Sequence, residues 1–284
     1  MKKVILGALS LFAFGATAQN LDNSLLWKIS GNGLKAPSYL FGTIHVTCDA
    51  TLDKSVLTAM DATQQLYMEL NMEDPNLQSQ LMAGMMMPEG KTMSKLVTEK
   101  QFNELNKFLL KNLGMSAMQI DSFKPAFVSM MLTFKLLDCP PKSIENELML
   151  ISQKQNEEVF GLESVQDQIA AFDKIPYEVQ MKQLMKSVKD DMAQDKAEFK
   201  KVMEIYNSRD LEQIMKFMNE TENDMYSDNA DVLLNERNNN WIPKIEAAAK
   251  ATPTFFGVGA AHLAGDQGVI QLLRKKGYTV EAVK

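Results

Sequence analysis

The sequence predicts a mixed α/β (α+β) protein in which strands from both ends of the chain form one central sheet. Runs with the strand pattern lie near both ends, whereas most of the middle has helical spacing. Short terminal strands cannot bury their apolar faces alone, so we expect them to pair in one mixed sheet. With 45% hydrophobic and 23% charged residues, the chain has the composition of a globular protein with a sizeable core.

The strands are expected in segments that are apolar or that alternate apolar and polar residues. These segments are residues 25–30, 38–46, 64–72, 158–162, 254–258 and 278–283. The turn Gly31-Asn32-Gly33 separates the first two segments and predicts a hairpin. In the third segment Leu66 and Met68 alternate with Glu69, so this glutamate is expected within a strand.

Helices are expected between these strands. Helical spacing is found in residues 52–62, 74–138, 143–155, 176–249 and 265–276. We expect the longest stretch to be interrupted near Asn207 and over residues 221–227, and the last helix to stop at Gly277. The prediction is therefore one domain over residues 19–284, with helical insertions at about 74–138 and 176–250.

The first residues have the pattern of a secretory signal peptide. Lys2 and Lys3 precede an apolar run over residues 4–14, and small residues follow, so we expect cleavage after Ala18. The run is shorter than the roughly 20 apolar residues that span a bilayer. We expect an exported protein, periplasmic or secreted, without a transmembrane segment after signal removal.

The charge balance excludes one class of partner. The chain has 30 Lys and Arg against 36 Asp and Glu, a net charge of −6. It lacks the basic patch and the motifs that are typical of nucleic-acid-binding proteins. We therefore expect no nucleic-acid partner.

The chain has 2 histidines, and both lie in the same local setting. Gly42 precedes His45 by three residues and Gly259 precedes His262 by three, each after an apolar strand. Glycine at a strand end allows close backbone approach, and ligand sites in α/β sheets lie where strand ends meet. Because histidine is the commonest metal ligand, the pattern indicates a shared metal site. The alternative is two core histidines held by backbone hydrogen bonds.

Two glutamates are candidates to complete such a site, since catalytic zinc generally has three protein ligands. Glu69 lies in an apolar strand, and Glu163 follows the strand at residues 158–162. A bare carboxylate in a core is costly, so each needs an explanation. The alternatives are that Glu69 pairs with a lysine and that Glu163 caps the helix beginning at Ser164.

The two cysteines, Cys48 and Cys139, have three interpretations. In an oxidising compartment they would form a disulfide or remain as two buried thiols. A catalytic thiol is the alternative, because Cys48 lies three residues after His45.

Methionine is unusually frequent, with 21 in the chain and four of them within residues 81–87. Methionines at helical spacing are typical of adaptable core packing. The alternatives are a substrate groove or a metal store.

Taken together, these segments resemble the TraB/GumN family, which is related to the Tiki metalloproteases. The resemblance extends over residues 25–283. The matching segments, in chain order, are Gly42-Thr43-Ile44-His45, Leu66-Tyr67-Met68-Glu69-Leu70, Leu162-Glu163-Ser164-Val165-Gln166, Glu236-Arg237-Asn238 with Trp241, Gly259-Ala260-Ala261-His262, and residues 265–280. Many relatives have an aspartate where this chain has Glu145.

The resemblance implies a fold similar to erythromycin esterase and the haem-binding ChaN group. It implies that His45, His262 and Glu69 bind a divalent metal (Mn²⁺, Co²⁺ or Zn²⁺), with Glu69 or Glu163 as the catalytic base. Arg237 would stabilise an oxyanion or, alternatively, form an ion pair on a helix surface. The implied function is an exported metal-dependent hydrolase that acts on peptides or proteins. The alternative is a non-catalytic metal- or haem-binding protein of the same fold.

Overall fold

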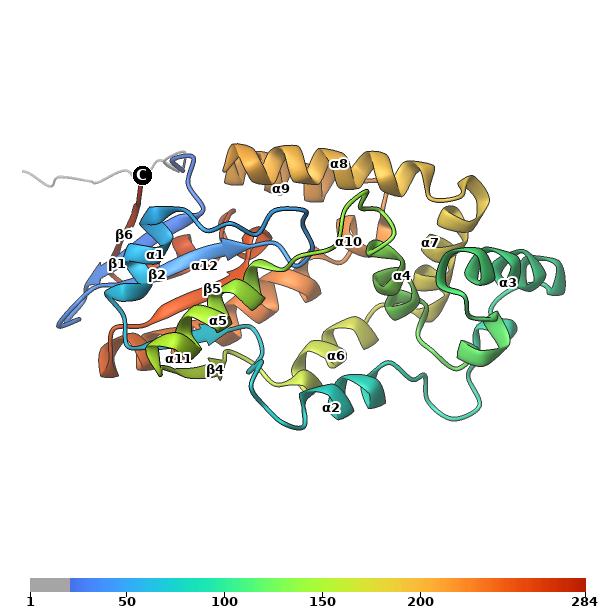
Figure 1. The fold of residues 1–284 in the computed structure, drawn as a ribbon, viewed down its shortest axis with the longest axis horizontal. Helices are drawn as coiled ribbons and strands as arrows, with labels where there is room; N and C mark the ends of the chain where they lie inside the picture. The colour runs from blue at the N-terminus through green and yellow to red at the C-terminus, as the bar shows by residue number, and fades with distance from the viewer. Residues whose placement is uncertain (1–20) are drawn as a thin grey trace, which may run out of the picture.

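The computed structural model describes residues 21–284, and strands from both ends of this range form one sheet (Figure 1). The predicted signal peptide, with its cleavage site after Ala18, lies outside the described residues. The strands are β1 (Leu26–Gly31), β2 (Ser38–Thr43), β3 (Gln65–Met68), β4 (Glu158–Gly161), β5 (Phe255–Gly259) and β6 (Tyr278–Ala282). Their order across the sheet is β4-β3-β5-β2-β1-β6.

The sheet is mixed, as predicted. Strands β4, β3, β5 and β2 are parallel neighbours, while β1 pairs antiparallel with β2 and β6. The predicted hairpin is confirmed, with Leu26 opposite Phe41. The C-terminal strand β5 lies between β2 and β3, so the middle of the sheet combines segments about two hundred residues apart in the chain.

Twelve α-helices and several short turns connect the described strands. The α-helices are α1 (Lys54–Asp61), α2 (Leu77–Gly84), α3 (Glu99–Leu113), α4 (Pro125–Thr133), α5 (Ile144–Gln155), α6 (Val165–Asp173), α7 (Tyr177–Asp190), α8 (Ala193–Ser208), α9 (Leu211–Glu220), α10 (Asp224–Ser227), α11 (Glu236–Ala251) and α12 (Val269–Lys275). The 3₁₀ turns are η1 (Met93–Lys95), η2 (Ala117–Ile120) and η4 (Ala260–His262), and η3 (Asp231–Asn235) is a π-helical turn. None of these helices is long and apolar enough to cross a bilayer.

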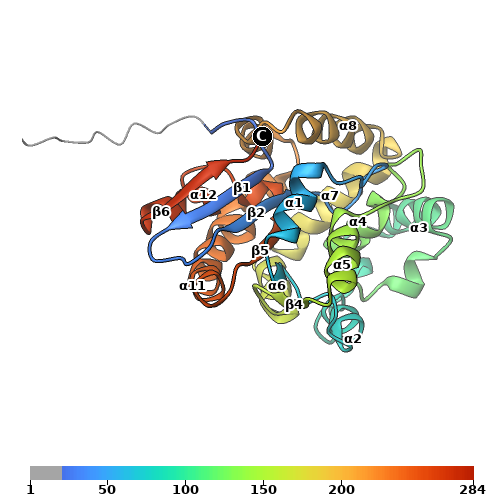
Figure 2. The same ribbon diagram turned by 60° about the vertical axis from the view of Figure 1, so that its left-hand side comes forward.

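The helices cover the sheet on both faces and extend beyond it. Figure 2 shows α1 and α5 on one face of the sheet and α11 and α12 on the other. Helices α2, α3, α4 and α7 continue away from the sheet (Figure 1). One hydrophobic core surrounds the sheet and includes Trp27, Phe256 and Trp241. A second core, which includes Met93 and Leu105, lies among the outer helices.

Three predicted element boundaries are wrong. The strand predicted over 38–46 ends at Thr43, because its partner β5 ends opposite it at Gly259. The strand predicted over 64–72 ends at Met68, so Glu69 follows the strand instead of lying within it. The helical stretch from residue 176 has a further break at Asp191 and Met192, both with positive φ, because Met192 is buried in the second core.

Gly42 allows β2 to lie directly against the turn that carries His262. A Cβ atom at Gly42 would lie 2.9 Å from Leu263 Cδ1 and 3.1 Å from Ala260 Cα. These separations are shorter than ordinary van der Waals contact, so only glycine fits without movement of η4. The carbonyl of Gly42 also accepts a hydrogen bond from Tyr206 Oη at 3.0 Å.

Replacing Gly42 with alanine is therefore expected to lower the free energy of unfolding by about 1–3 kcal/mol, the usual cost of overpacking. Urea denaturation of the two proteins measures this difference. An unchanged unfolding free energy would contradict the close approach of β2 to η4.

Candidate functional site

The two histidines and two glutamates predicted for the site follow the carboxyl ends of parallel strands. His45 lies two residues past β2, Glu69 directly follows β3, and Glu163 lies two residues past β4. His262 ends the turn η4, which directly follows β5. The carboxyl ends of parallel strands meet at one edge of the sheet, which is where ligands bind in α/β folds. The topology therefore brings these side chains to the same edge.

Arg237, on the first turn of α11, is the centre of this edge. Its Nη2 atom lies 2.6 Å from Glu69 Oε2 and 2.5 Å from Glu163 Oε1. The three side chains are only 12%, 11% and 5% exposed. Buried charges need partners, and here one guanidinium serves two carboxylates. The alternatives of a lysine partner for Glu69 and a surface ion pair for Arg237 are therefore wrong.

The carboxylate of Glu163 holds the guanidinium in place. Arg237 Nε donates to its two oxygens at 3.1 and 3.2 Å, and Trp241 Nε1 donates to Oε2 at 3.0 Å. The cap of α6 is Ser164, whose hydroxyl accepts from the backbone N–H of Asp167, so Glu163 is not the helix cap. With these acceptor positions occupied, Glu163 is poorly placed to take a proton from a substrate.

Glu69 connects the arginine to the strand β5. Its Oε1 accepts the backbone N–H of Gly259 at 2.9 Å, and its Oε2 accepts from Gln168 Nε2 at 3.1 Å. A Cβ at position 259 would lie 3.2 Å from Oε1, so glycine leaves room for the carboxylate. Burial raises the pKa of Glu69, but the interactions with His262, with the guanidinium of Arg237 and with the backbone N–H of Gly259 outweigh burial and hold this pKa well below its usual range.

His262 is buried, and its hydrogen bonds define its tautomer. Nδ1 lies 2.7 Å from Asn238 Oδ1, and Asn238 Nδ2 donates to the carbonyl of Gln267 at 2.9 Å, which fixes the amide orientation. Nδ1 of His262 therefore carries the proton. The lone pair on Nε2 faces Arg237 Nη1 at 3.1 Å and Glu69 Oε1 at 3.8 Å. Burial lowers the pKa of His262 to about 3, so the ring is neutral.

His45 has the opposite environment, with a side chain that is 70% exposed. Its Nδ1 lies 2.6 Å from Glu145 Oε1, and this hydrogen bond raises the pKa of His45 to about 9. Glu145 also accepts from the hydroxyls of Thr43 and Ser143, both at 2.7 Å. Burial raises the pKa of Glu145, but the hydrogen bond from His45 outweighs it and the pKa is lowered.

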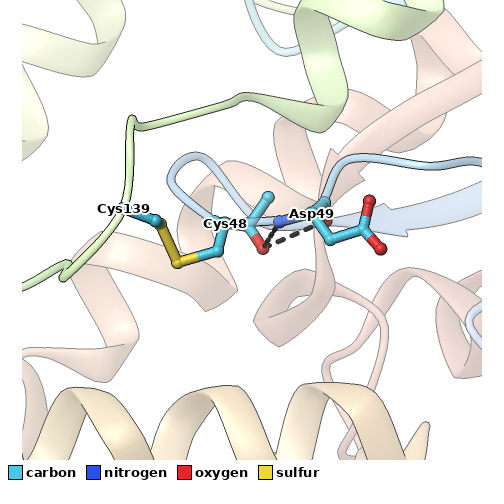
Figure 3. Close-up of a disulfide and its surroundings, with 4 residues drawn as sticks. Cys48, Asp49 and Cys139 are labelled. Carbon is cyan, nitrogen blue, oxygen red and sulfur yellow. Dashed lines mark hydrogen bonds between the residues drawn. A yellow bond between two sulfur atoms is a disulfide. The ribbon is translucent and has the colours of Figure 1, made fainter.

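A disulfide holds the His45 segment against the Glu145 segment. Cys48 and Cys139 are bonded (Figure 3). Beyond it, Thr47 and Lys142 exchange backbone hydrogen bonds of 3.0 and 2.8 Å. The two cross-links lie between His45 and the start of α5, which carries Glu145, so they fix the partner of the exposed histidine.

The donor chemistry of the edge fits a divalent metal ion. Metal-binding histidines characteristically donate one ring N–H to an outer oxygen, as both rings do here through Nδ1, to Glu145 and to Asn238. Two imidazole nitrogens and a carboxylate suit Zn²⁺, Mn²⁺ or Co²⁺. Within residues 21–284, however, no three His, Cys, Asp or Glu side chains form a ready cluster. A metal at His262 Nε2 requires Arg237 Nη1 to withdraw from that nitrogen.

Several contacts at this edge were not predicted from the sequence. In the sequence, Asn238 and Trp241 stand out only as parts of a segment shared with the family, and no pattern indicates Gln168. On α11, Trp241 lies four residues after Arg237 and three after Asn238, a spacing that makes it a neighbour of both on the helix surface. The glutamine in the family segment, Gln166, instead donates to Gln80 at the surface.

The fold and the site define a mixed α/β protein with a buried histidine–glutamate–arginine centre at the carboxyl edge of its parallel strands. The family model described as TraB/PrgY/gumN matches residues 25–282, and the chain belongs to this family.

Curated relatives of the chain are named metalloproteases. Metalloprotease TIKI2 of Danio rerio is 23% identical over 91% of this chain, and Metalloprotease TIKI homolog of Nematostella vectensis is 22% identical over 95%. The alignments cover 61% and 69% of those two proteins. Metalloprotease TIKI1 of Xenopus tropicalis is 32% identical over 32% of the chain and 18% of its own length. No solved structure matches the chain.

Replacing Arg237 with glutamine is expected to lower the free energy of unfolding by about 3–5 kcal/mol, because two buried carboxylates lose their counter-charge. Arg209→Gln is the matched control, since the Arg209–Asp53 pair is 49% and 53% exposed. An exposed pair of this kind contributes at most about 1 kcal/mol. Urea denaturation compares the two variants, and equal losses would contradict the central role of Arg237.

Removing the disulfide by the double substitution Cys48→Ser and Cys139→Ser is expected to lower the free energy of unfolding by about 2–5 kcal/mol, because the bond closes a long loop. The sequence separation of 91 residues sets the size of that loop. Thermal or urea denaturation under non-reducing conditions measures the loss. Equal stability of the serine variant and the oxidised protein would refute this expectation.

Proposed function

We propose that this protein is an exported metal-dependent hydrolase that acts on peptide or protein substrates. The observation that carries the proposal is the shared arrangement of His45 and His262. Each imidazole is held through Nδ1 by an oxygen acceptor, and each follows a parallel strand at the edge that also holds Glu69. The metalloprotease names of the curated relatives support the same reaction class.

The roles of the residues follow from their contacts. His45, His262 and Glu69 would bind the divalent ion, for which Mn²⁺, Co²⁺ and Zn²⁺ are candidates. When bound, such an ion supplies Lewis-acid polarisation of a carbonyl. Both glutamates are hydrogen-bonded through both oxygens, but Glu69 is the one next to a candidate ligand, because its Oε1 lies 3.8 Å from His262 Nε2, whereas Glu163 faces Arg237 and Trp241.

Arg237 would stabilise negative charge that develops on the substrate. Its Nη1 group is directed at His262 Nε2, next to the candidate ligands, and the two glutamates fix its orientation. A guanidinium keeps its charge at all relevant pH values and is preorganised here by neighbouring carboxylates. Glu163 acts on this reaction as a positioning residue through Arg237.

Export is part of the same proposal. The disulfide between Cys48 and Cys139 supports it, because disulfides persist in oxidising compartments and are rare in the cytosol. The N-terminal pattern of Lys2, Lys3 and the apolar run at 4–14 is the proposed export signal, and the periplasm or the cell exterior is the proposed location.

Metal binding tests the site directly. The double substitution His45→Ala and His262→Ala is expected to abolish binding of Mn²⁺, Co²⁺ and Zn²⁺, measured by elemental analysis after dialysis, with an unchanged far-UV circular dichroism spectrum. Asn238→Ala is expected to weaken metal affinity by about 10–100-fold, since it removes the hydrogen bond that orients His262. Asn239→Ala, at the neighbouring exposed position, is the control.

Peptide turnover then separates the two candidate functions. A peptide library incubated with the metal-loaded protein is expected to show cleavage that the double histidine variant lacks. Unchanged metal content in the double variant would refute the site. Tight binding of metal or haem without any turnover would favour the non-catalytic binding protein.

A further inference from the structure

An apolar pocket of about 230 Å³ lies between helices α2, α4 and α6, beside the candidate site. Figure 1 shows these three helices next to one another where the outer helices meet the sheet. The pocket lining includes phenylalanine and methionine side chains, and it contains no charged residue. Its one polar side chain is that of Gln168. Ligand sites are typically apolar concavities of this kind, with a few placed polar groups.

Some of the methionines that do not belong to the hydrophobic cores line this pocket. Met85, from the methionine-rich segment 81–87, lines the pocket together with Met130 and Met131 of α4. Phe134 at its rim is 52% exposed, which is unusual for a large aromatic side chain. Methionine adapts its shape to different apolar partners, so this lining suits several apolar side chains rather than one.

Hydrogen bonds and an aromatic contact hold two walls of the pocket, α4 and α6, in position relative to each other. The buried side chain of Gln180 accepts the backbone N–H of Ala126 on α4 at 3.2 Å and donates to the carbonyl of Phe172 on α6 at 3.2 Å. The rings of Phe127 and Phe172 lie 5.9 Å apart at the base of these helices. A pre-formed wall binds without the entropic cost of ordering it.

Helix α2, the third wall of the pocket, is also held in position by packing. A Cβ at Gly84, the last residue of α2, would lie 1.7 Å from Ile169 Cδ1, so α2 and α6 are in direct contact here. Ile169 also lines the pocket. The cavity is therefore bounded on three sides by helices whose mutual positions are set by packing.

Gln168 connects this pocket to the candidate active site. The same side chain that lines the pocket donates from Nε2 to Glu69 Oε2 at 3.1 Å. The side chain of Gln168 thus contacts both a group bound in the pocket and the carboxylate of Glu69, the proposed ligand or base. We propose that the pocket binds one large apolar side chain of the peptide substrate next to the scissile bond. This inference rests on the proposed hydrolase function and adds its substrate class.

The size and charge of the pocket define the preferred side chain. An apolar cavity of about 150 Å³ is enough to bind benzene, so the larger pocket here accommodates Phe, Leu or Met. A carboxylate or ammonium group would lose its hydration without gaining a charged partner. We expect kcat/KM for peptides with Phe, Leu or Met at this position to exceed that for Asp or Lys by about 10–100-fold.

The experiment uses blocked hexapeptides that differ at one central position, which is Phe, Leu, Met, Asp or Lys. Cleavage by protein loaded with Mn²⁺, Co²⁺ or Zn²⁺ is followed by mass spectrometry, and binding of each peptide is measured separately by titration calorimetry. Met131→Trp fills the pocket and is expected to remove the preference for apolar side chains. Met118→Trp is the matched control, because Met118 is 70% exposed and outside the pocket lining.

A second pair of variants tests the pocket independently, in case Met131→Trp does not fold. Phe134→Asp places a carboxylate at the exposed rim and is expected to shift the preference towards the Lys peptide. Leu110→Asp is its control, since Leu110 on α3 is similarly exposed, at 48%, and outside the pocket lining. An unchanged preference in both Met131→Trp and Phe134→Asp would overturn the pocket assignment.

The outcomes distinguish failure of the pocket from failure of the proposed function. Cleavage of all five peptides at similar rates would overturn the pocket and leave the hydrolase function standing. Absence of cleavage, with binding of apolar peptides that Met131→Trp abolishes, would support the pocket and refute the hydrolase. Absence of both cleavage and selective binding would refute both.

Discussion

The buried guanidinium of Arg237 is the interaction on which the rest of this site depends. It links Glu69, after β3, to Glu163, after β4, and it contacts His262, after β5. Three adjacent strand ends are thereby held by one side chain of α11. Two carboxylates beside one cation leave an excess negative charge in a buried place, which is costly unless every oxygen is hydrogen-bonded. Gly259, Gln168 and Trp241 supply those bonds.

The two histidines show how one sequence motif can give two chemical environments. Each lies three residues after a glycine, yet the pKa of His45 is raised to about 9 and that of His262 is lowered to about 3. The difference comes from their partners. His45 is hydrogen-bonded to a carboxylate, that of Glu145, whereas His262 is buried against a neutral amide, that of Asn238. The motif sets the backbone position, and residues remote in the chain set the charge state.

Much of the fold could be predicted from the sequence, because strand and helix patterns are local. The hairpin, the six strands and the position of His262 after a strand end follow from alternation, turns and glycine spacing, whereas His45 lies beyond the end of β2 and not within the strand predicted over 38–46. The ends of β2 and β3 could not be predicted, since β2 stops opposite Gly259, the last residue of β5, and β3 stops opposite Gly161, the last residue of β4. The strand order could not be predicted from the sequence either, because it depends on pairing between distant segments.

The candidate site was predictable in its residue types but not in its contacts. Glycine spacing and strand ends in the sequence indicate His45, His262, Glu69 and Glu163, and the family resemblance indicates Arg237. That Arg237 pairs with both glutamates, across 168 and 74 residues of sequence, is a long-range fact that no local pattern encodes. The contact between Gln168 and Glu69 could not be predicted for the same reason, since the two residues are 99 positions apart in the sequence.

The place of β5 in the sheet has a consequence for the order of folding. Residues Phe255–Gly259 lie between β2 and β3, so the N-terminal strands remain two separate pairs until this late segment is available. Arg237 and His262 belong to the same late part of the chain. Non-local pairing of this kind is slow to form and leaves strand edges open in the meantime. The carboxyl edge of the parallel strands is therefore assembled only once residues 237–262 are available, after β1 to β4.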